Sequence, residues 1–264
     1  MPSASTALDD WLSVALSSHE RLVAVVSPLS ADDVDGPSYD DEWTIADVLS
    51  HLGSGAEIFS LLLKAGLEGN PAPEMSAFQE VWDRWNAKSP DAKAKDGLAA
   101  DKHFLDQVQG LDQSARDGWR LDFFGGEQTL AGLLRLRVGE HAVHTWDVEV
   151  VADPSATVAP EAVSLLIDGL DQLVARFPNP LGKTVVVELA TSGPGRRFLL
   201  TADANGMTLA DANEERPEAG FSALQLPSEA MLRLVYGRLD PEHTPDVDGE
   251  TSDLETLRRL FPGF

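Results

Sequence analysis

Apolar residues recur at intervals of three and four positions through the first two thirds of the chain, which is typical of amphipathic helices. This spacing predicts helices over residues 6–26, from 44 onward, over 76–108 with a break at 89–90, over 129–151 and over 161–177. Thr44 followed three residues later by Asp47 has the sequence of a capping box. Thr129 is suited to cap the fourth helix, and Pro160 to the first turn of the fifth.

The pattern changes after the two-proline segment Phe177-Pro178-Asn179-Pro180, where short β-rich runs begin. We expect a meander of three strands, over residues 184–189, 197–202 and 207–210, with a hairpin signal at Asn205-Gly206. Helices opening at Pro227-Ser228 and after Ser252 complete this part. The sequence therefore predicts two domains, a helical one over residues 1–178 and a small α+β one over 181–264.

Composition and charge narrow the possible partners. The 264 residues are 43% hydrophobic, enough to build a core, and carry a formal net charge of -24. So much negative charge argues against binding to nucleic acid or to anionic membrane surfaces. Neither a basic leader nor an apolar run of roughly 18 residues is evident, so we expect a cytoplasmic protein.

The helix predicted over 129–151 has polar residues where a bundle should be apolar. Arg137, Glu140, His144 and Asp147 fall in one sector of the helical wheel together with Leu133. Uncompensated charges in such a position cost several kcal/mol each. A divalent cation bound by Glu140 and His144, four residues apart, would compensate them, with Arg137 left to neutralise a ligand or another carboxylate.

His51, on the second predicted helix, is the candidate third ligand. Two imidazoles and one carboxylate suit Zn²⁺ first, and a three-ligand site with open positions is the catalytic rather than the structural arrangement. Two alternatives stay open, because the Glu140 and His144 pair is also common on solvent-facing helices and a single histidine is often a hydrogen-bonded core residue. Asp47 either orients His51 or only caps its helix.

The other histidines are given no ligand role. His141 is interpreted as a neighbour of the site because it is rotated toward apolar positions. The remaining three, His19, His103 and His243, are interpreted as structural or surface residues. The sequence has no cysteine, so a metal site would use only histidine and carboxylate, and any thiol chemistry would need an external thiol.

Two segments together resemble a known family. Trp43-Thr44-Ile45-Ala46-Asp47-Val48 followed by His51-Leu52, and then Arg137-x-x-Glu140-x-x-x-His144-x-x-Asp147, are similar to the mycothiol-dependent maleylpyruvate isomerase family of the DinB-like superfamily. The tail from Lys183 resembles that family's sterol-carrier-like C-terminal domain, including its Leu-Pro-Ser-Glu-Ala helix and Gly237-Arg238. The resemblance implies an α+β protein with an antiparallel four-helix bundle in which His51, Glu140 and His144 ligate the metal.

The resemblance also implies an activity. Members of the family use the thiol mycothiol either to isomerise a cis keto dicarboxylic acid or to transfer the thiol to an electrophile. A metal of this kind would lower the pKa of the external thiol. Because maleylpyruvate is a dianion, the site needs positive charge, and Arg137 and Arg238 are the candidate catalytic residues. Arg238 could instead be an ordinary arginine at a helix C-terminus that faces water.

Two other functions stay open at this point. The bundle could hold a structural metal in a non-catalytic protein whose second domain binds an apolar ligand, or the open site could activate water as a metal hydrolase. The sequence does not identify the electrophile, the native metal or the oligomeric state.

Overall fold

The structure is a computed structural model and describes residues 4–40, 42–212 and 222–263. The chain divides into two compact units, Met1–Ala156 and Thr157–Phe264. The first unit contains the helices α1 (Ala4–Val26), α2 (Ala31–Val34), α3 (Ile45–Glu68), α4 (Met75–Asn86), α5 (Pro90–Gln109), α6 (Gln113–Gly118) and α7 (Leu130–Ala152). None of the helices in the described ranges has the length and apolar character needed to cross a membrane.

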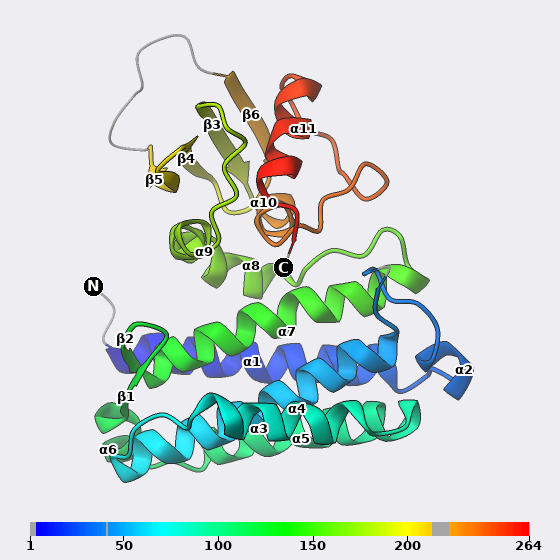
Figure 1. The fold of residues 1–264 in the computed structure, drawn as a ribbon, viewed down its shortest axis with the longest axis vertical. Helices are drawn as coiled ribbons and strands as arrows, with labels where there is room; N and C mark the ends of the chain where they lie inside the picture. Colours follow the sequence, from blue (N-terminus) through cyan, green and yellow to red (C-terminus); the bar gives the residue numbers. More distant parts are fainter. Residues whose placement is uncertain (1–3, 41, 213–221, 264) are drawn as a thin grey trace. The chain divides into compact units, whose positions relative to one another are not determined.

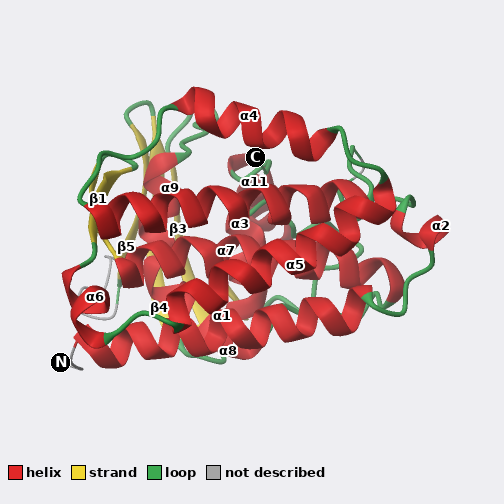
Figure 2. Ribbon diagram, turned by 90° about the horizontal axis from the view of Figure 1, so that it is seen from below, coloured by secondary structure: helices red, strands yellow, loops and turns green. Residues whose placement is uncertain are grey.

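The long helices α1, α3, α5 and α7 form the predicted four-helix bundle (Figures 1 and 2). Both α3 and α1 pack against α5 and α7, and α4 lies along α3. The predicted capping box is confirmed, since Thr44 Oγ1 accepts from the Asp47 backbone N–H at 3.1 Å and Asp47 accepts from the Thr44 N–H in return. Thr129 caps α7 through a single hydrogen bond, because its Oγ1 accepts from the Gly132 N–H at 3.2 Å.

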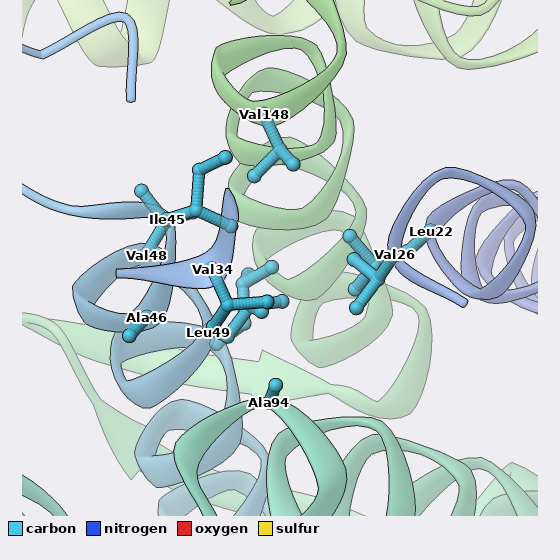
Figure 3. Close-up of a cluster of buried hydrophobic side chains, with 10 residues drawn as sticks. Leu22, Val26, Val34, Ile45, Ala46, Val48, Leu49, Ala94 and Val148 are labelled. Atoms are coloured by element: carbon cyan, nitrogen blue, oxygen red, sulfur yellow. The ribbon is translucent and has the colours of Figure 1, made fainter. Parts of the chain in front are cut away.

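Buried aliphatic side chains fix the start of α3 within the bundle. Figure 3 shows this cluster, which draws on five helices and contains Leu22, Val26, Val34, Ile45, Ala46, Val48, Leu49, Leu52, Ala94 and Val148. Leu49 and Leu52 flank the candidate ligand His51 along the chain and are almost completely buried. The position of His51 is therefore set by core packing on both sides of it.

Two glycines allow α3 to approach its neighbours closely. A Cβ at Gly97 of α5 would lie 2.7 Å from the Leu49 carbonyl oxygen, and one at Gly53 of α3 would lie 2.3 Å from the Trp85 ring of α4. Both distances are shorter than real contacts of this kind. Glycine is therefore required at both positions for the observed packing.

The structure differs from the sequence prediction at two places near α7. A short hairpin of β1 (Arg120–Phe123) and β2 (Gly126–Thr129), which was not predicted, precedes α7. The helix predicted over 161–177 is divided into α8 (Pro160–Leu166), the 3₁₀ turn η1 (Ile167–Gly169) and α9 (Leu170–Arg176). Gly169 ends the turn, and a glycine inside a helix weakens it through backbone entropy.

The second unit has a four-stranded sheet in the order β5-β4-β3-β6. The predicted meander is confirmed as β3 (Val185–Ser192), β4 (Arg196–Asp203) and β5 (Gly206–Asp211), which pair antiparallel. β6 (Ser222–Pro227) was missed and pairs parallel with β3. It leads into α10 (Ser228–Val235), and α11 (Thr251–Leu260) follows, close to the predicted helices.

The division between the units falls earlier than the sequence placed it. Because α9 packs against β5 and α10 packs against α8 and α9, these helices group with the sheet. The first unit therefore ends after Ala156, and residues 157–178 belong with the second.

Candidate metal centre

Three predicted ligands converge between α3 and α7. His51 Nε2 lies 2.9 Å from Glu140 Oε2, and His144 Nε2 lies 3.7 Å from the same oxygen. One candidate ligand atom from each residue lies within 4.8 Å of the others. The structure thus brings together the residues that helical spacing and the family resemblance had selected.

The donor set fits a single divalent ion. Two ligand atoms about 2.1 Å from a tetrahedral ion are about 3.4 Å apart, and the separations from Glu140 lie on either side of this value. The side chains of His51 and Glu140 are 37% and 42% exposed, whereas that of His144 is 11% exposed. An ion held here would keep contact with solvent on one side and could take a further ligand.

His144 is oriented by a buried carboxylate. Its Nδ1–H donates to Asp147 Oδ2 at 2.8 Å, and its Nε2 atom lies on the side of Glu140, 3.7 Å from Oε2. The Asp147 backbone carbonyl accepts from the Tyr39 N–H, so the loop before α3 is attached to the same turn of α7. The sequence placed Asp147 in the polar sector but gave it no role, although its spacing of three residues from His144 was an available signal.

Asp47, which was considered for orienting His51, forms its hydrogen bonds with other residues. Its Oδ2 atom accepts from Thr44, and its Oδ1 atom accepts from Lys93 Nζ at 2.7 Å. Its capping role is therefore observed. The pKa of Asp47 is lowered, because the hydrogen bonds from Lys93 and Thr44 outweigh the opposing effect of burial.

The surroundings set the charge state of the candidate ligands. Burial opposes ionisation of Glu140, but the hydrogen bond from His51 and the charges of His144, His51 and Arg137 lower its pKa to about 2. Burial lowers the pKa of His51, and the hydrogen bond to Glu140 offsets this only in part. At neutral pH the site therefore contains an ionised carboxylate and a neutral His51 imidazole, the forms that bind metal.

Trp43 lies against both imidazoles. Its ring centroid is 5.3 Å from that of His51 and 6.0 Å from that of His144, with an interplanar angle of 18° to the latter. Trp43 therefore restricts the imidazole rotamers and forms an apolar wall of the site. The sequence contained Trp43 within the family-like segment without indicating this contact.

A second polar cluster lies in the bundle core, centred on Asp101 of α5. Asp101 Oδ2 accepts from His19 Nδ1 at 2.6 Å and from His141 Nε2 at 2.9 Å, and Oδ1 accepts from Arg137 Nε and Nη2 at 3.1 and 2.6 Å. Arg137 Nη2 also donates to the Leu52 carbonyl at 2.9 Å. One buried carboxylate thus connects α1, α5, α7 and, through Arg137, α3.

This second cluster is poorly suited to a metal, although His19, Asp101 and His141 also lie within 4.8 Å of one another. The guanidinium of Arg137 occupies Asp101 Oδ1 and would repel a cation. All four side chains are buried, so no position faces solvent. His19 has a structural role in this cluster, as expected. His141, expected to be a neighbour of the candidate metal centre, donates to Asp101.

Sequence reasoning missed Asp101, although a signal existed. On α5 the buried positions are Ala94, Gly97, Asp101, Phe104, Leu105 and Val108, so a charged residue occupies an otherwise apolar stripe. Arg137 neutralises this other carboxylate, one of the two roles predicted for it. Gly55 of α3 gives space to Arg137, because a Cβ there would lie 3.1 Å from Arg137 Nη1.

Arg238, the other predicted catalytic residue, lies in the second unit and is buried. Its Nη1 donates to the Tyr236 carbonyl at 2.8 Å. The alternative of an arginine facing water is therefore wrong, because the guanidinium is held within the turn that follows α10. The two histidines outside both clusters behave as expected, with His103 exposed and His243 paired with Asp240 at 2.8 Å.

Comparisons with known proteins point to one family. A family model described as the mycothiol maleylpyruvate isomerase N-terminal domain matches residues 15–149, just over half of the chain. A crystal structure of a mycothiol-dependent maleylpyruvate isomerase matches with a TM-score of 0.68 and 15% identity, covering 95% of each chain. The structure of a mutant of such an enzyme, with one histidine replaced by alanine, matches with the same TM-score and coverage at 14% identity. No curated protein matches the sequence.

Proposed function

Because the chain belongs to the mycothiol-dependent maleylpyruvate isomerase family, we propose that it is a metal-dependent enzyme that uses mycothiol as an external nucleophile. Its reaction is either the isomerisation of a cis keto dicarboxylic acid of the maleylpyruvate type or the transfer of the thiol to a small electrophile. The observation that carries this proposal is the convergence of His51, Glu140 and His144 at a position with a solvent-facing side.

These three residues would hold one divalent ion, Zn²⁺ by the chemistry of the donor set. When bound, such an ion supplies a Lewis acid that lowers the pKa of a coordinated thiol. Glu140 is already ionised at neutral pH. His144 Nε2 is kept available by the hydrogen bond from Nδ1 to Asp147.

The thiol must come from outside, because the chain has no cysteine. In both reactions the thiolate sulfur forms a bond to an electrophilic carbon. In isomerisation, addition converts the cis double bond into a single bond, rotation follows, and elimination of the same thiolate restores the double bond in the trans form. In transfer, the adduct leaves as the product and one thiol is consumed for each turnover.

Calorimetric titration of mycothiol into zinc-loaded protein tests this function. In two buffers of different ionisation enthalpy, we expect saturable binding with release of about one proton per site, since a free thiol with a pKa near 8.5 is mostly protonated at pH 7. His144→Ala should abolish the binding, whereas His103→Ala, on an exposed position of α5, should preserve it. Absence of binding, or binding that survives His144→Ala, would refute the proposal.

The balance of thiol then separates the two reactions. With maleylpyruvate or a related electrophile, an isomerase leaves the total free thiol unchanged while substrate is converted, and a transferase lowers it by one equivalent per product. Conversion of substrate without any thiol would instead support the hydrolase alternative.

A further inference from the structure

Asp101 holds the turn of α7 that carries Glu140 at two points. Its Oδ1 atom accepts from Arg137 Nε and Nη2 at 3.1 and 2.6 Å, and its Oδ2 atom accepts from His141 Nε2 at 2.9 Å. Arg137 and His141 are four residues apart, so both project from one face of α7, and Glu140 directly precedes His141. Two attachments on one face oppose rotation of this helix about its axis. The direction in which Glu140 leaves α7 is therefore restrained by a carboxylate of another helix.

The same arginine connects α7 to α3 beside another candidate ligand. Arg137 Nη2 donates to the Leu52 carbonyl at 2.9 Å, and Leu52 directly follows His51. On α7, Glu140 lies three residues after Arg137, which is within one helical turn. The guanidinium therefore joins the two helices next to the pair formed by His51 and Glu140, whose nitrogen and oxygen atoms are 2.9 Å apart. It restrains the distance between α3 and α7 at the level of the candidate ligands.

The helix α5 carries none of the three candidate ligands, yet it contacts both helices that do. Asp101 links α5 to α7. Gly97, one turn earlier on the same face, lets the α5 backbone approach α3, since a Cβ there would lie 2.7 Å from the Leu49 carbonyl oxygen. Leu49 precedes His51 by two residues. Therefore α5 is a common support for the segments of α3 and α7 from which the candidate ligands project.

Stability alone is a weak explanation for this buried cluster. Replacing a buried ion pair by apolar side chains of similar volume is often neutral or stabilising, because desolvation of the charges offsets their attraction. Arg137 and Asp101 are 1% and 0% exposed, so their desolvation is nearly complete. Hydrogen bonds are directional, however, and a satisfied buried network fixes the relative orientation of the helices that it joins. The cluster is better explained by the orientation that it imposes than by a gain in folding free energy.

We propose that Asp101 is a positioning residue of the candidate metal centre, which through Arg137 and His141 fixes α7 relative to α3 before an ion binds. The three ligand side chains then need little rearrangement to coordinate a divalent ion, which raises the affinity and sets the coordination geometry. The inference rests on the proposed function, because it takes the three candidate ligands as the metal site.

Zinc affinity, measured by chelator competition, tests this proposal without thiol or substrate. Asp101→Asn should bind Zn²⁺ about tenfold more weakly, because the asparagine amide nitrogen cannot accept a hydrogen bond and one attachment of α7 is lost. The visible absorption of bound Co²⁺, which depends on the number and geometry of its ligands, should change as well. Leu105→Ala is the matched control, since Leu105 is buried one turn later on α5 and its truncation destabilises the bundle by leaving a cavity. This control should keep the zinc affinity and the Co²⁺ spectrum of the wild type.

The double variant Asp101→Leu, Arg137→Met separates positioning from stability and from charge. It removes one negative and one positive charge together, so the net charge near the candidate metal centre is unchanged, and it should be more stable in urea than Asp101→Asn. It should nevertheless bind Zn²⁺ about tenfold more weakly than the wild type, because the link to the Leu52 carbonyl is lost.

Two results would overturn the proposal while leaving the proposed function intact. One is wild-type zinc affinity in Asp101→Asn or, should that variant not fold, in the double variant. The other is a zinc affinity that follows stability across all the variants, so that Leu105→Ala weakens binding as much as Asp101→Asn does. If the wild type bound no Zn²⁺, or if His144→Ala bound it equally well, the proposed function would fail together with this inference.

Discussion

Asp101→Asn is the most informative test of the buried cluster. The carboxylate accepts four hydrogen bonds, one from His19, one from His141 and two from Arg137, and it is completely buried. Asparagine has nearly the same size, so the change removes the charge with little effect on packing. Its amide group also offers N–H donors where the native residue offers only acceptors.

The expected loss follows from the charge left behind. Removing one partner of a buried ion pair typically costs about 3–5 kcal/mol, because the other charge remains without compensation. The asparagine carbonyl can still accept one or two of the hydrogen bonds, which favours the lower end of this range. We therefore expect a loss of about 3 kcal/mol, a large part of a typical unfolding free energy of about 5–15 kcal/mol.

Urea unfolding followed by helical circular dichroism measures this loss, with the slope of free energy against urea checked for constancy. Asp106→Asn is the matched control on the same helix, because Asp106 is exposed and its pairing with Lys102 is a surface ion pair worth about 0–1 kcal/mol. The double variant Asp101→Leu, Arg137→Met should recover part of the loss. A loss below about 1 kcal/mol in Asp101→Asn, or a double variant no more stable than the single one, would refute the reasoning.

Other predictions address orientation, pH and packing. Asp147→Asn should weaken zinc binding about 10–100-fold in a chelator competition assay, because it removes the acceptor that orients His144; equal affinity would contradict this. Burial lowers the pKa of His141 below 6.5, so the unfolded chain takes up a proton that the folded chain does not, and the unfolding free energy falls as pH drops below about 6.5. His141→Gln should flatten this decline between pH 7.5 and 5 in urea midpoints, and parallel profiles would count against the assignment. Gly97→Ala should destabilise the bundle by about 1–3 kcal/mol in the same assay, since its Cβ would lie 2.7 Å from the Leu49 carbonyl, and wild-type stability would show that α5 can shift freely.

The four-helix bundle could be predicted because the signals for its helices, apolar spacing and capping residues, lie within each helix. Apolar spacing located the four long helices, and the capping sequence at Thr44 marked the start of α3 correctly. Apolar spacing gave a wrong prediction at η1. It suggested one continuous helix over 161–177, although the turn ending at Gly169 interrupts it. It also failed at β6, whose partner β3 lies more than 30 residues earlier, so no hairpin signal precedes it.

The Asp101 cluster could not be predicted in the same way. Its partners His19, Arg137 and His141 are separated from it by 82, 36 and 40 residues, and only the packing of α1, α5 and α7 brings them together. An aspartate in an apolar stripe indicates that some donor must compensate it, but the sequence does not identify which one. The candidate metal centre was easier to predict, because two of its three candidate ligands share one helix at a spacing of four residues.

The polar residues of α7 differ in how deeply their side chains reach into the bundle, although they lie on the same side of the helix. Arg137, Glu140 and His144 share one sector, but helical position alone does not determine how far each side chain reaches into the bundle. Arg137 reaches Asp101, whereas Glu140 stays near the surface with His51. Gly55 permits this arrangement, because a larger residue there would press on the guanidinium. The same arginine therefore compensates a core carboxylate, and its charge also helps to lower the pKa of Glu140 at the candidate metal centre.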